Sequence, residues 1–256
     1  MNKIINDFSI TVGTVNGSGS STANNTIMRA IFKMGVPVSG KNLFPSNIQG
    51  LPTWYIIRAN KDGFVAHHER KDIVIAMNPA SFARDLASVA PGGAFYYADD
   101  IKQPITREDI AVYPMPIKAI IRADASIPTN YRDLVGNMVY VGILAQMINL
   151  DMDIILAALT FHFKGKQKPI DMNFNALKAG AEWAKVNLEK KDPFYIEPMN
   201  GTEGMIMADG NTAAALGSIF GGLQFAAVLQ VIGVSLKAVG LINIRGRQNA
   251  CAFHVG

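Results

Sequence analysis

The first half of the chain alternates short apolar runs with a helix-like segment. Residues 8–15 are rich in β-forming side chains and residues 72–77 are almost entirely apolar, so each predicts a buried strand. Between them, apolar positions recur at helical spacing over residues 23–34, with Ser21 or Thr22 as the expected cap. A strand, a glycine-rich turn and a helix in this order predict the opening unit of an α/β fold.

Further elements follow the same alternation. Strands are predicted at 53–59, 64–67, 94–98 and 110–113, and a helix at 81–89. The turn signal Lys61-Asp62-Gly63 predicts that the first two of these strands pair as an antiparallel hairpin, whereas the Gly- and Pro-rich residues 35–52 predict a long loop. We therefore expect an open, mostly parallel sheet with helices on both faces.

From residue 130 the apolar spacing becomes helical, which predicts a C-terminal helical extension. Its helices are expected at about 131–148, 152–163 and 175–188, with Asp151 and Asn173 capping the second and third.

Residues 212–236 contain no charged side chain. The stretch is long enough to span a bilayer. However, it lacks flanking aromatic residues, and Gln224 and Gln230 would be costly in lipid, so a helix buried in a large core is the favoured interpretation.

Composition indicates a globular protein. Hydrophobic residues make up 49%, charged residues 17%, and the net charge is +4. Cationic side chains are scattered, which argues against a nucleic-acid binder and suits an anionic cofactor or an acidic electron carrier. The single cysteine, Cys251, cannot form an internal disulfide or hold an iron–sulfur cluster alone. Without a recognisable secretion signal, the expected compartment is the cytoplasm.

One segment has the features of an anion site, and it comprises Asn16, Gly17, Ser18, Gly19 and Ser20. It follows a predicted strand and precedes a predicted helix, so backbone N–H groups and hydroxyls could bind a phosphate there. The third glycine of the dinucleotide fingerprint is absent, as is the acidic residue that would bind a ribose, which argues against NAD and FAD. The alternative is a structural turn in which the glycines only permit a tight bend.

Other chemical signals are weak. Residues 35–42 nearly match a P-loop, but Asn42 replaces the magnesium-binding hydroxyl and the segment follows a helix instead of a strand. His67 and His68 are neighbours that would point to opposite faces of a strand, and no Cys/His pair has metal-ligand spacing. The sequence therefore assigns no catalytic residue and no metal site.

Several longer stretches together resemble one family. They are VGTVNGSGSSTAN (12–24), the run 28–58, DIVIAMNP (72–79), NMVYVGILA (137–145) and DGNTAAALGSIFGG (209–222). These stretches are similar to 2-oxoacid:acceptor oxidoreductases, and most similar to the α subunit of 2-oxoglutarate:ferredoxin oxidoreductase with its γ domain fused at the N-terminus. The resemblance covers about residues 6–227, and 35–58 is its most specific part.

The resemblance implies an activity for the complete enzyme. A 2-oxoacid, here 2-oxoglutarate, is decarboxylated on thiamine diphosphate, the acyl group passes to coenzyme A, and electrons leave through iron–sulfur clusters to ferredoxin. The γ domain is expected to close over coenzyme A, so the 16–20 turn would approach its phosphates. The α domain would supply the pyrimidine side of the thiamine site, and a separate β subunit the diphosphate and Mg²⁺ site.

The resemblance also implies a domain organisation. We expect a γ-type domain over 1–192, a linker over 193–208, the start of a second α/β domain, which binds the thiamine pyrimidine, over 209–227, and a divergent tail over 228–256. The family continues after Ala227 with a Tyr-Pro-Ile-Thr-Pro-type segment that this sequence lacks. We therefore expect that the gene is truncated, split or frameshifted, and that its product is inactive without partner subunits. Two alternatives stay open: a non-enzymatic γ-like binding or assembly module, and a protein tethered to a membrane through 212–236.

Overall fold

The computed structural model describes residues 2–44, 48, 50–125 and 127–222, together with the backbone of β9 (Val228–Ile232) and β10 (Ser235–Val239). The chain divides into two compact units, Met1–Met205 and Ile206–Gly256. Cys251 and the expected break at Ala227 lie outside the described residues.

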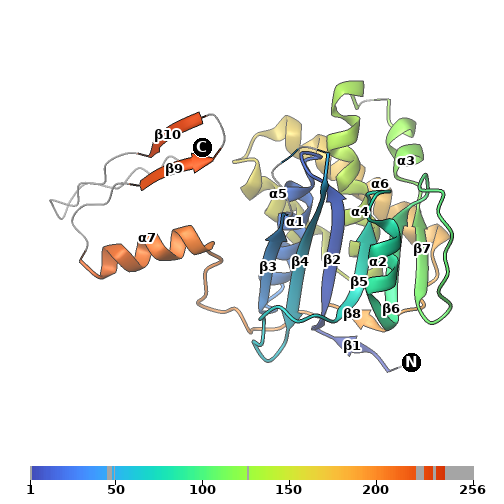
Figure 1. Ribbon diagram of the computed structural model, residues 1–256, viewed down its shortest axis with the longest axis horizontal. Coiled ribbons are helices and arrows are strands. Elements are labelled where there is room, and N and C mark those ends of the chain that lie inside the picture. Colours follow the sequence, from blue (N-terminus) through green and yellow to red (C-terminus); the bar gives the residue numbers. More distant parts are fainter. Residues whose placement is uncertain are drawn as a thin grey trace. The chain divides into compact units, whose positions relative to one another are not determined.

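The first unit is built on a six-stranded sheet with the strand order β3-β4-β2-β5-β6-β7 (Figure 1). Its strands are β2 (Asp7–Val15), β3 (Val38–Leu43), β4 (Pro52–Asn60), β5 (Lys71–Ala76), β6 (Val89–Ala98) and β7 (Ala111–Met115). The neighbours β2, β5, β6 and β7 are parallel, and β4 runs antiparallel to both β2 and β3. The open, mostly parallel α/β sheet predicted from the sequence is therefore confirmed.

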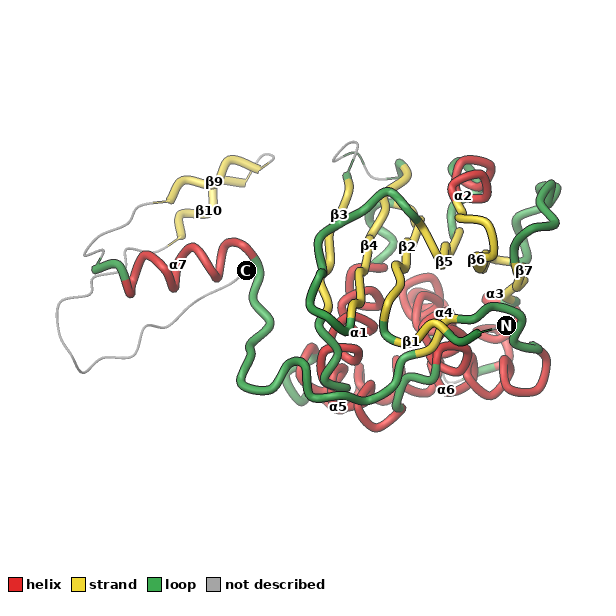
Figure 2. The backbone as a smooth tube through the Cα atoms, turned by 90° about the horizontal axis from the view of Figure 1, so that it is seen from below, coloured by secondary structure: helices red, strands yellow, loops and turns green. Residues whose placement is uncertain are grey.

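Helices lie on both faces of this sheet. They are α1 (Ser20–Lys33), α2 (Phe82–Ser88), α3 (Ile117–Ala123), α4 (Arg132–Ile148), α5 (Met152–His162) and α6 (Gln167–Asn187). Figure 2 shows α2 on one face and α1, α4 and α6 on the other. The predicted helical extension corresponds to α4, α5 and α6, whereas α3 was not predicted.

The core lies between the sheet and the layer of α1, α4 and α6. Alternate side chains of β2, such as Phe8 and Ile10, are fully buried in the same cluster as Ile27 and Ile31 of α1. Because side chains of a strand alternate between its two faces, only this register places the large apolar groups of β2 against the helices. Full burial of each such side chain stabilises the fold by about 1.5–3 kcal/mol.

The structure corrects the prediction for residues 35–70. A strand, β3, occupies residues 38–43 of the expected loop 35–52 and forms the hairpin with β4, whereas residues 64–67 form no strand. The sequence of β3, VSGKNL, is mostly polar because an edge strand is only partly buried, so it carries no apolar periodicity. In the sheet, β4 and β5 lie on opposite sides of β2. The segment that connects β4 to β5 must therefore pass β2.

Helix starts are also corrected. Gly19, not Ser21 or Thr22, is the N-cap of α1. Helix α6 begins at Gln167, so Asn173 lies inside it; Pro169 is tolerated in the first turn, where its missing N–H would have no helical partner. The predicted cap of α5 is confirmed, since the Asp151 carboxylate accepts hydrogen bonds from two backbone N–H groups at 2.8 and 3.1 Å.

The chain after α6 packs against the first unit. Strand β8 (Phe194–Tyr195) pairs in parallel with β1 (Ile4–Ile5). The Met199 N–H donates to the Met34 carbonyl at 2.9 Å, and the Thr202 hydroxyl donates to the Phe32 carbonyl at 2.9 Å. The segment expected to be a linker from residue 193 therefore begins inside this unit.

The second unit contains α7 (Gly210–Phe220), β9 and β10. Residues 212–236 are not one buried helix as expected, because α7 ends at Phe220 and β9 begins at Val228. None of the α7 side chains is buried. Within the described part of the chain, no helix has the length and apolar character needed to cross a membrane.

Candidate anion site at the carboxyl edge of the sheet

The carboxyl ends of β2 and β5 lie next to each other in the middle of the sheet. Helix α1 leaves β2 over one face, and α2 leaves β5 over the other (Figure 2). The chain thus changes sides between these two strands, and open α/β sheets bind ligands in the crevice outside such a switch point. The 16–20 turn follows β2 directly, so the predicted anion site falls at this position.

The backbone of the turn needs its glycines. Gly17 has φ 85° and Gly19 has φ 77°, both in the left-handed region that favours glycine. A Cβ at position 19 would also lie 2.0 Å from Cδ1 of Leu134 in α4. The Ser18 N–H donates to the Val15 carbonyl at 3.1 Å, which closes the bend. The glycines therefore have a structural role whether or not an anion binds.

The N-terminus of α1 carries a partial positive charge that a ligand could approach. The first N–H groups of a helix have no carbonyl four residues earlier to bond to, although here the Thr22 N–H reaches the Gly19 carbonyl at 3.3 Å. Helix α1, which is described in full, has no acidic residue in its first turn, and its N-cap Gly19 has no side chain that could accept a hydrogen bond. The partial positive charge at this end is thus not neutralised by the helix itself, which favours an anion from outside.

The two serine hydroxyls of the turn differ. The Ser20 hydroxyl is buried and shares a hydrogen bond of 2.9 Å with the Thr14 hydroxyl. The Ser18 hydroxyl oxygen is also buried but has no hydrogen-bond partner among the residues that the structure describes. A buried, unpaired hydroxyl is costly. Ser18 is therefore the side chain of the turn that has most to gain from a ligand.

Two buried asparagines donate hydrogen bonds to backbone carbonyls at this edge, and neither was predicted from the sequence. Asn137 of α4 donates from Nδ2 to the Ser18 carbonyl at 2.8 Å. Asn78, after β5, donates from Nδ2 to the Thr14 carbonyl at 3.4 Å. Each lies directly beside an apolar run, residues 138–145 for Asn137 and residues 73–77 for Asn78, and an amide in such a position is the signal that could have found them.

A buried carboxylate lies under the edge, on the face covered by α2. Asp85 accepts hydrogen bonds from the Trp54 indole and the Ser81 hydroxyl, both at 2.7 Å. Burial raises the pKa of the Asp85 carboxyl, while these hydrogen bonds and the charges of Lys71 and Arg84 act in the opposite direction. Asp85 is only 1% exposed and its carboxylate already accepts these two hydrogen bonds, so it supports the edge and does not face a ligand.

A histidine lies beside the start of α1, and a basic segment follows it in the sequence. Nε2 of His162, at the end of α5, is 3.1 Å from the Thr22 hydroxyl, and burial and the charge of Arg29 lower the pKa of this histidine. The exposed Lys164, Lys166 and Lys168 follow it. This is the densest basic stretch of the sequence, and positive charge near the turn would favour an anion there.

The remaining candidates do not join this site. Residues 35–42 run from the end of α1 into β3, the reverse of the strand-to-helix order of a P-loop. His67 and His68 lie in the segment between β4 and β5. Among the described residues, no group of three or more His, Cys, Asp or Glu side chains is placed to hold a metal ion.

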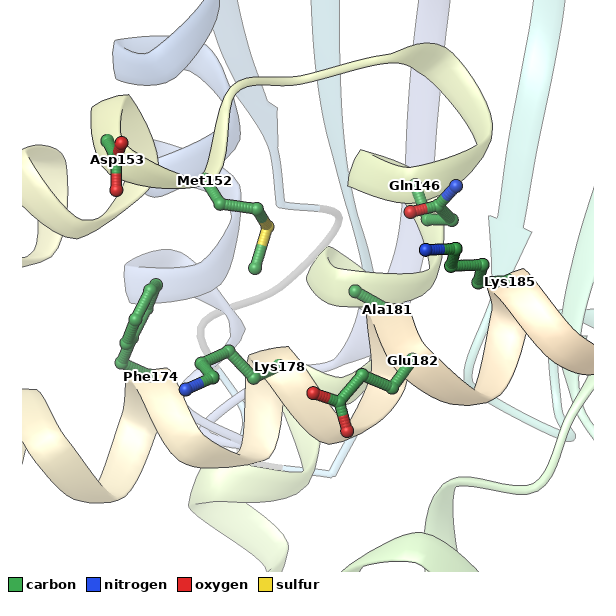
Figure 3. A pocket seen from close by; sticks show the side chains of 8 residues that line it. All are labelled: Gln146, Met152, Asp153, Phe174, Lys178, Ala181, Glu182 and Lys185. Atoms are coloured by element: carbon green, nitrogen blue, oxygen red, sulfur yellow. The ribbon is translucent and has the colours of Figure 1, made fainter.

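A groove of about 410 Å³ lies elsewhere, between α4, α5 and α6 (Figure 3). Its polar lining mixes both charges, with Lys178 and Lys185 beside Glu182 and Asp153. Gln146 in this groove is about 14 Å along α4 from Asn137, given the rise of an α-helix. We place the candidate site at the sheet edge because the N-terminus of α1 and the unpaired Ser18 hydroxyl lie there.

The fold and the position of the turn define an open α/β module with its candidate site at the switch point between β2 and β5. Residues 9–183 match the model of the family described as pyruvate ferredoxin/flavodoxin oxidoreductase. The chain belongs to this family, and the resemblance seen in the sequence is confirmed.

Individual relatives agree with this assignment. The α subunit of 2-oxoacid:ferredoxin oxidoreductase 2 from Aeropyrum pernix is 23% identical over 85% of this chain and 40% of its own length. Ketoisovalerate oxidoreductase subunit VorA from Methanothermobacter thermautotrophicus is 31% identical over 46% of this chain and 24% of its own length. The chain thus spans well under half the length of these relatives.

Solved structures share the fold. The 2-oxoglutarate:ferredoxin oxidoreductase from Magnetococcus marinus, with 2-oxoglutarate, coenzyme A and succinyl-CoA bound, matches with a TM-score of 0.75 and 27% identity over 88% of this chain and 38% of that chain. A keto/oxoacid ferredoxin oxidoreductase γ subunit from Geobacter sulfurreducens matches with a TM-score of 0.58 and 14% identity, over 70% of this chain and 99% of its own. The latter likeness concerns the fold alone.

Proposed function

We propose that the chain is a subunit of a 2-oxoacid:ferredoxin oxidoreductase. The complete enzyme would oxidatively decarboxylate 2-oxoglutarate to the acyl-CoA and pass the electrons to ferredoxin. The main support is the likeness, over 88% of this chain, to an oxidoreductase structure that holds 2-oxoglutarate, coenzyme A and succinyl-CoA. Family membership over residues 9–183 supports the same reaction class.

The proposed roles of this chain and of its partner subunits follow from the expected domains. Residues 1–192 would be the γ-type domain, and α7 would belong to the beginning of the α domain at 209–227. Thiamine diphosphate, Mg²⁺ and the iron–sulfur cluster would be held by the rest of the complex, including a β subunit. Coenzyme A supplies the thiol that takes the acyl group, and this chain would bind its phosphates at the 16–20 turn.

The residues of the turn fit a phosphate. The N–H groups at the start of α1 would donate to its oxygens, and the Ser18 hydroxyl, which has no partner in the described structure, would add a further donor. These contacts would fix the position of coenzyme A without taking part in bond making. The role of the turn is thus to orient the acyl acceptor.

A first experiment tests the subunit role and the substrate. The purified chain, alone and combined with the remaining subunits of the same complex, is assayed for coenzyme A-dependent reduction of a viologen dye. We expect turnover only in the combined sample, with a higher kcat/KM for 2-oxoglutarate than for pyruvate. Robust turnover by the chain alone would refute the subunit role, and a preference for pyruvate would refute the substrate.

A second experiment tests the anion site. Ser18→Ala removes a buried hydroxyl that has no partner in the described structure, so the free energy of unfolding should not decrease. The KM for coenzyme A should rise by roughly tenfold, because a hydrogen bond to a charged group contributes about 1.5–3 kcal/mol. Gly19→Val is a poorer test, since φ 77° and Leu134 would impair folding as well. An unchanged KM in Ser18→Ala would contradict the site.

A further inference from the structure

Asn137 stands out because it connects α4 to the candidate site. Its side chain is buried, with the residue 5% exposed, and its Nδ2 lies 2.8 Å from the carbonyl oxygen of Ser18, 119 positions earlier in the sequence. The same Nδ2 reaches the carbonyls of Leu134 and Asp133 in its own helix only at 3.3 and 3.5 Å. The contact with the turn is therefore its shortest hydrogen bond.

This contact fixes the direction of one peptide group. In a trans peptide the carbonyl and the following N–H point in opposite directions, and the peptide bonds of the described chain are trans. Because the Ser18 carbonyl points at Asn137 in α4, the Gly19 N–H must point away from α4. That direction leaves the Gly19 amide available at the N-terminus of α1.

The turn needs such a constraint because Gly19 is permissive. Glycine occupies positive and negative φ about equally readily, so the Ser18–Gly19 peptide could rotate without the steric cost that another residue would impose. With the carbonyl facing outward instead, the turn would present a partial negative charge to an anion. A donor on the α4 side favours the orientation that presents the N–H.

We propose that Asn137 is a positioning residue of the anion site, which orients the Gly19 amide toward the phosphate without touching the ligand. This inference rests on the proposed function of the turn. By this proposal, α4 contributes to the affinity for phosphate-bearing ligands, a contribution that the sequence of the turn alone does not indicate.

If Asn137 had only a structural role, its loss would lower stability without a specific effect on the KM for coenzyme A. The same helix provides a matched control for this alternative. Tyr140, one turn further along α4, donates from its buried hydroxyl to Asn24 of α1 at 2.9 Å. Tyr140→Phe also removes a buried hydrogen bond between α4 and the β2–α1 unit, but it does not touch the turn. It reports what the loss of such a bond does to stability alone.

The experiment uses the chain assembled with its partner subunits and compares Asn137→Asp, Asn137→Ala, Tyr140→Phe and Ser18→Ala. Both Asn137 variants should raise the KM for coenzyme A at least tenfold, with little change in the KM for the 2-oxoacid. The KM for pantetheine, the part of coenzyme A that lacks phosphates, should not change. Tyr140→Phe should lower the melting temperature comparably and keep the KM for coenzyme A within twofold.

The outcomes separate the two claims. If Ser18→Ala raises the KM for coenzyme A but the Asn137 variants do not, the phosphate site stands and the positioning role is overturned. If Tyr140→Phe and the Asn137 variants raise it equally, the effect is a general loss of stability, and the positioning role is again overturned. If neither Ser18 nor Asn137 variants change it, the proposed phosphate site itself fails.

Discussion

Gly142 of α4 lies so close to Leu177 of α6 that a Cβ at position 142 would come within 1.8 Å of the Leu177 carbonyl oxygen. Gly180 of α6 approaches the Val139 carbonyl in the same way, where a Cβ would lie at 2.4 Å. The two helices therefore cross with their backbones in contact. Asn137 is less than two turns from this crossing, so the packing of α4 on α6 also sets the position from which Asn137 meets the 16–20 turn.

Gly142→Ala should destabilise the chain, although alanine is the better helix former. The added methyl group meets backbone, which cannot rotate away, so α4 and α6 must separate at a cost of about 1–3 kcal/mol. Chemical unfolding monitored by circular dichroism measures this change. Gly136→Ala in the same helix is the control, because its Cβ would meet the nearest atom, Cγ2 of Ile117, at an ordinary 3.5 Å.

The control should gain stability, by up to about 1 kcal/mol, because alanine restricts the unfolded chain and favours the helix. If both alanine variants unfold at the same denaturant concentration, the backbone contact between α4 and α6 does not determine the packing.

The elements that could be predicted from the sequence are those that bury a strong apolar pattern. β5 and α4 are examples, because DIVIAM and the apolar run of 135–148 must be covered whatever surrounds them. β3 could not be predicted, since its strand pairing rests on backbone hydrogen bonds to β4 while none of its side chains is fully buried. Pairing of that kind leaves no apolar periodicity in the sequence.

The candidate site could be predicted only in its local part. Glycines next to serines between a strand and a helix are recognisable over five residues, and these lie where that pattern places them, at the switch point. Asn137 and Asp85 come to the same edge only through the packing of α4 and α2. No spacing rule in one sequence relates Ser18 to a residue more than a hundred positions away.

Asp192 is the centre of a buried polar network elsewhere in the first unit. Its side chain is fully buried, accepts a hydrogen bond from the Tyr113 hydroxyl at 2.9 Å, and pairs with Nζ of Lys190 at 2.7 Å. Asp192→Ala should destabilise the chain by about 3–5 kcal/mol, because it leaves a largely buried ammonium group without its partner. Urea unfolding at pH 7 measures the loss.

The pair of Arg107 and Asp109 provides the comparison for this prediction. Its carboxylate side chain is 49% exposed, so Asp109→Ala removes a solvated ion pair and should change the free energy of unfolding only slightly. Equal losses in Asp192→Ala and Asp109→Ala would show that burial does not determine the strength of the Asp192 network.

The buried Asp85 should make stability depend on pH with a definite sign. Burial raises the pKa of its carboxyl above the ordinary value of 3.8, against the lowering effect of the Ser81 and Trp54 hydrogen bonds and the charges of Lys71 and Arg84. Between 3.8 and the raised pKa, the folded chain holds this proton more readily than the unfolded chain does. The contribution of Asp85 to stability is therefore complete below 3.8 and is lost as the pH rises through the raised pKa.

Asp85→Asn removes this titration and keeps a side chain of the same shape beside Trp54 and Ser81. Its free energy of unfolding relative to the unsubstituted chain should therefore increase between pH 4 and pH 7, as urea titrations at intervals of one pH unit would measure.

Asp7→Asn is a control of opposite sign. Although partial burial raises the pKa of Asp7, hydrogen bonds from Asn60 and Arg58 and the charge of Arg58 lower it overall. That variant should lose relative stability as the pH rises from acid toward neutral, because the native carboxylate is then favoured. If the relative stability of Asp85→Asn did not increase over this range, the assigned pKa shift of Asp85 would be wrong.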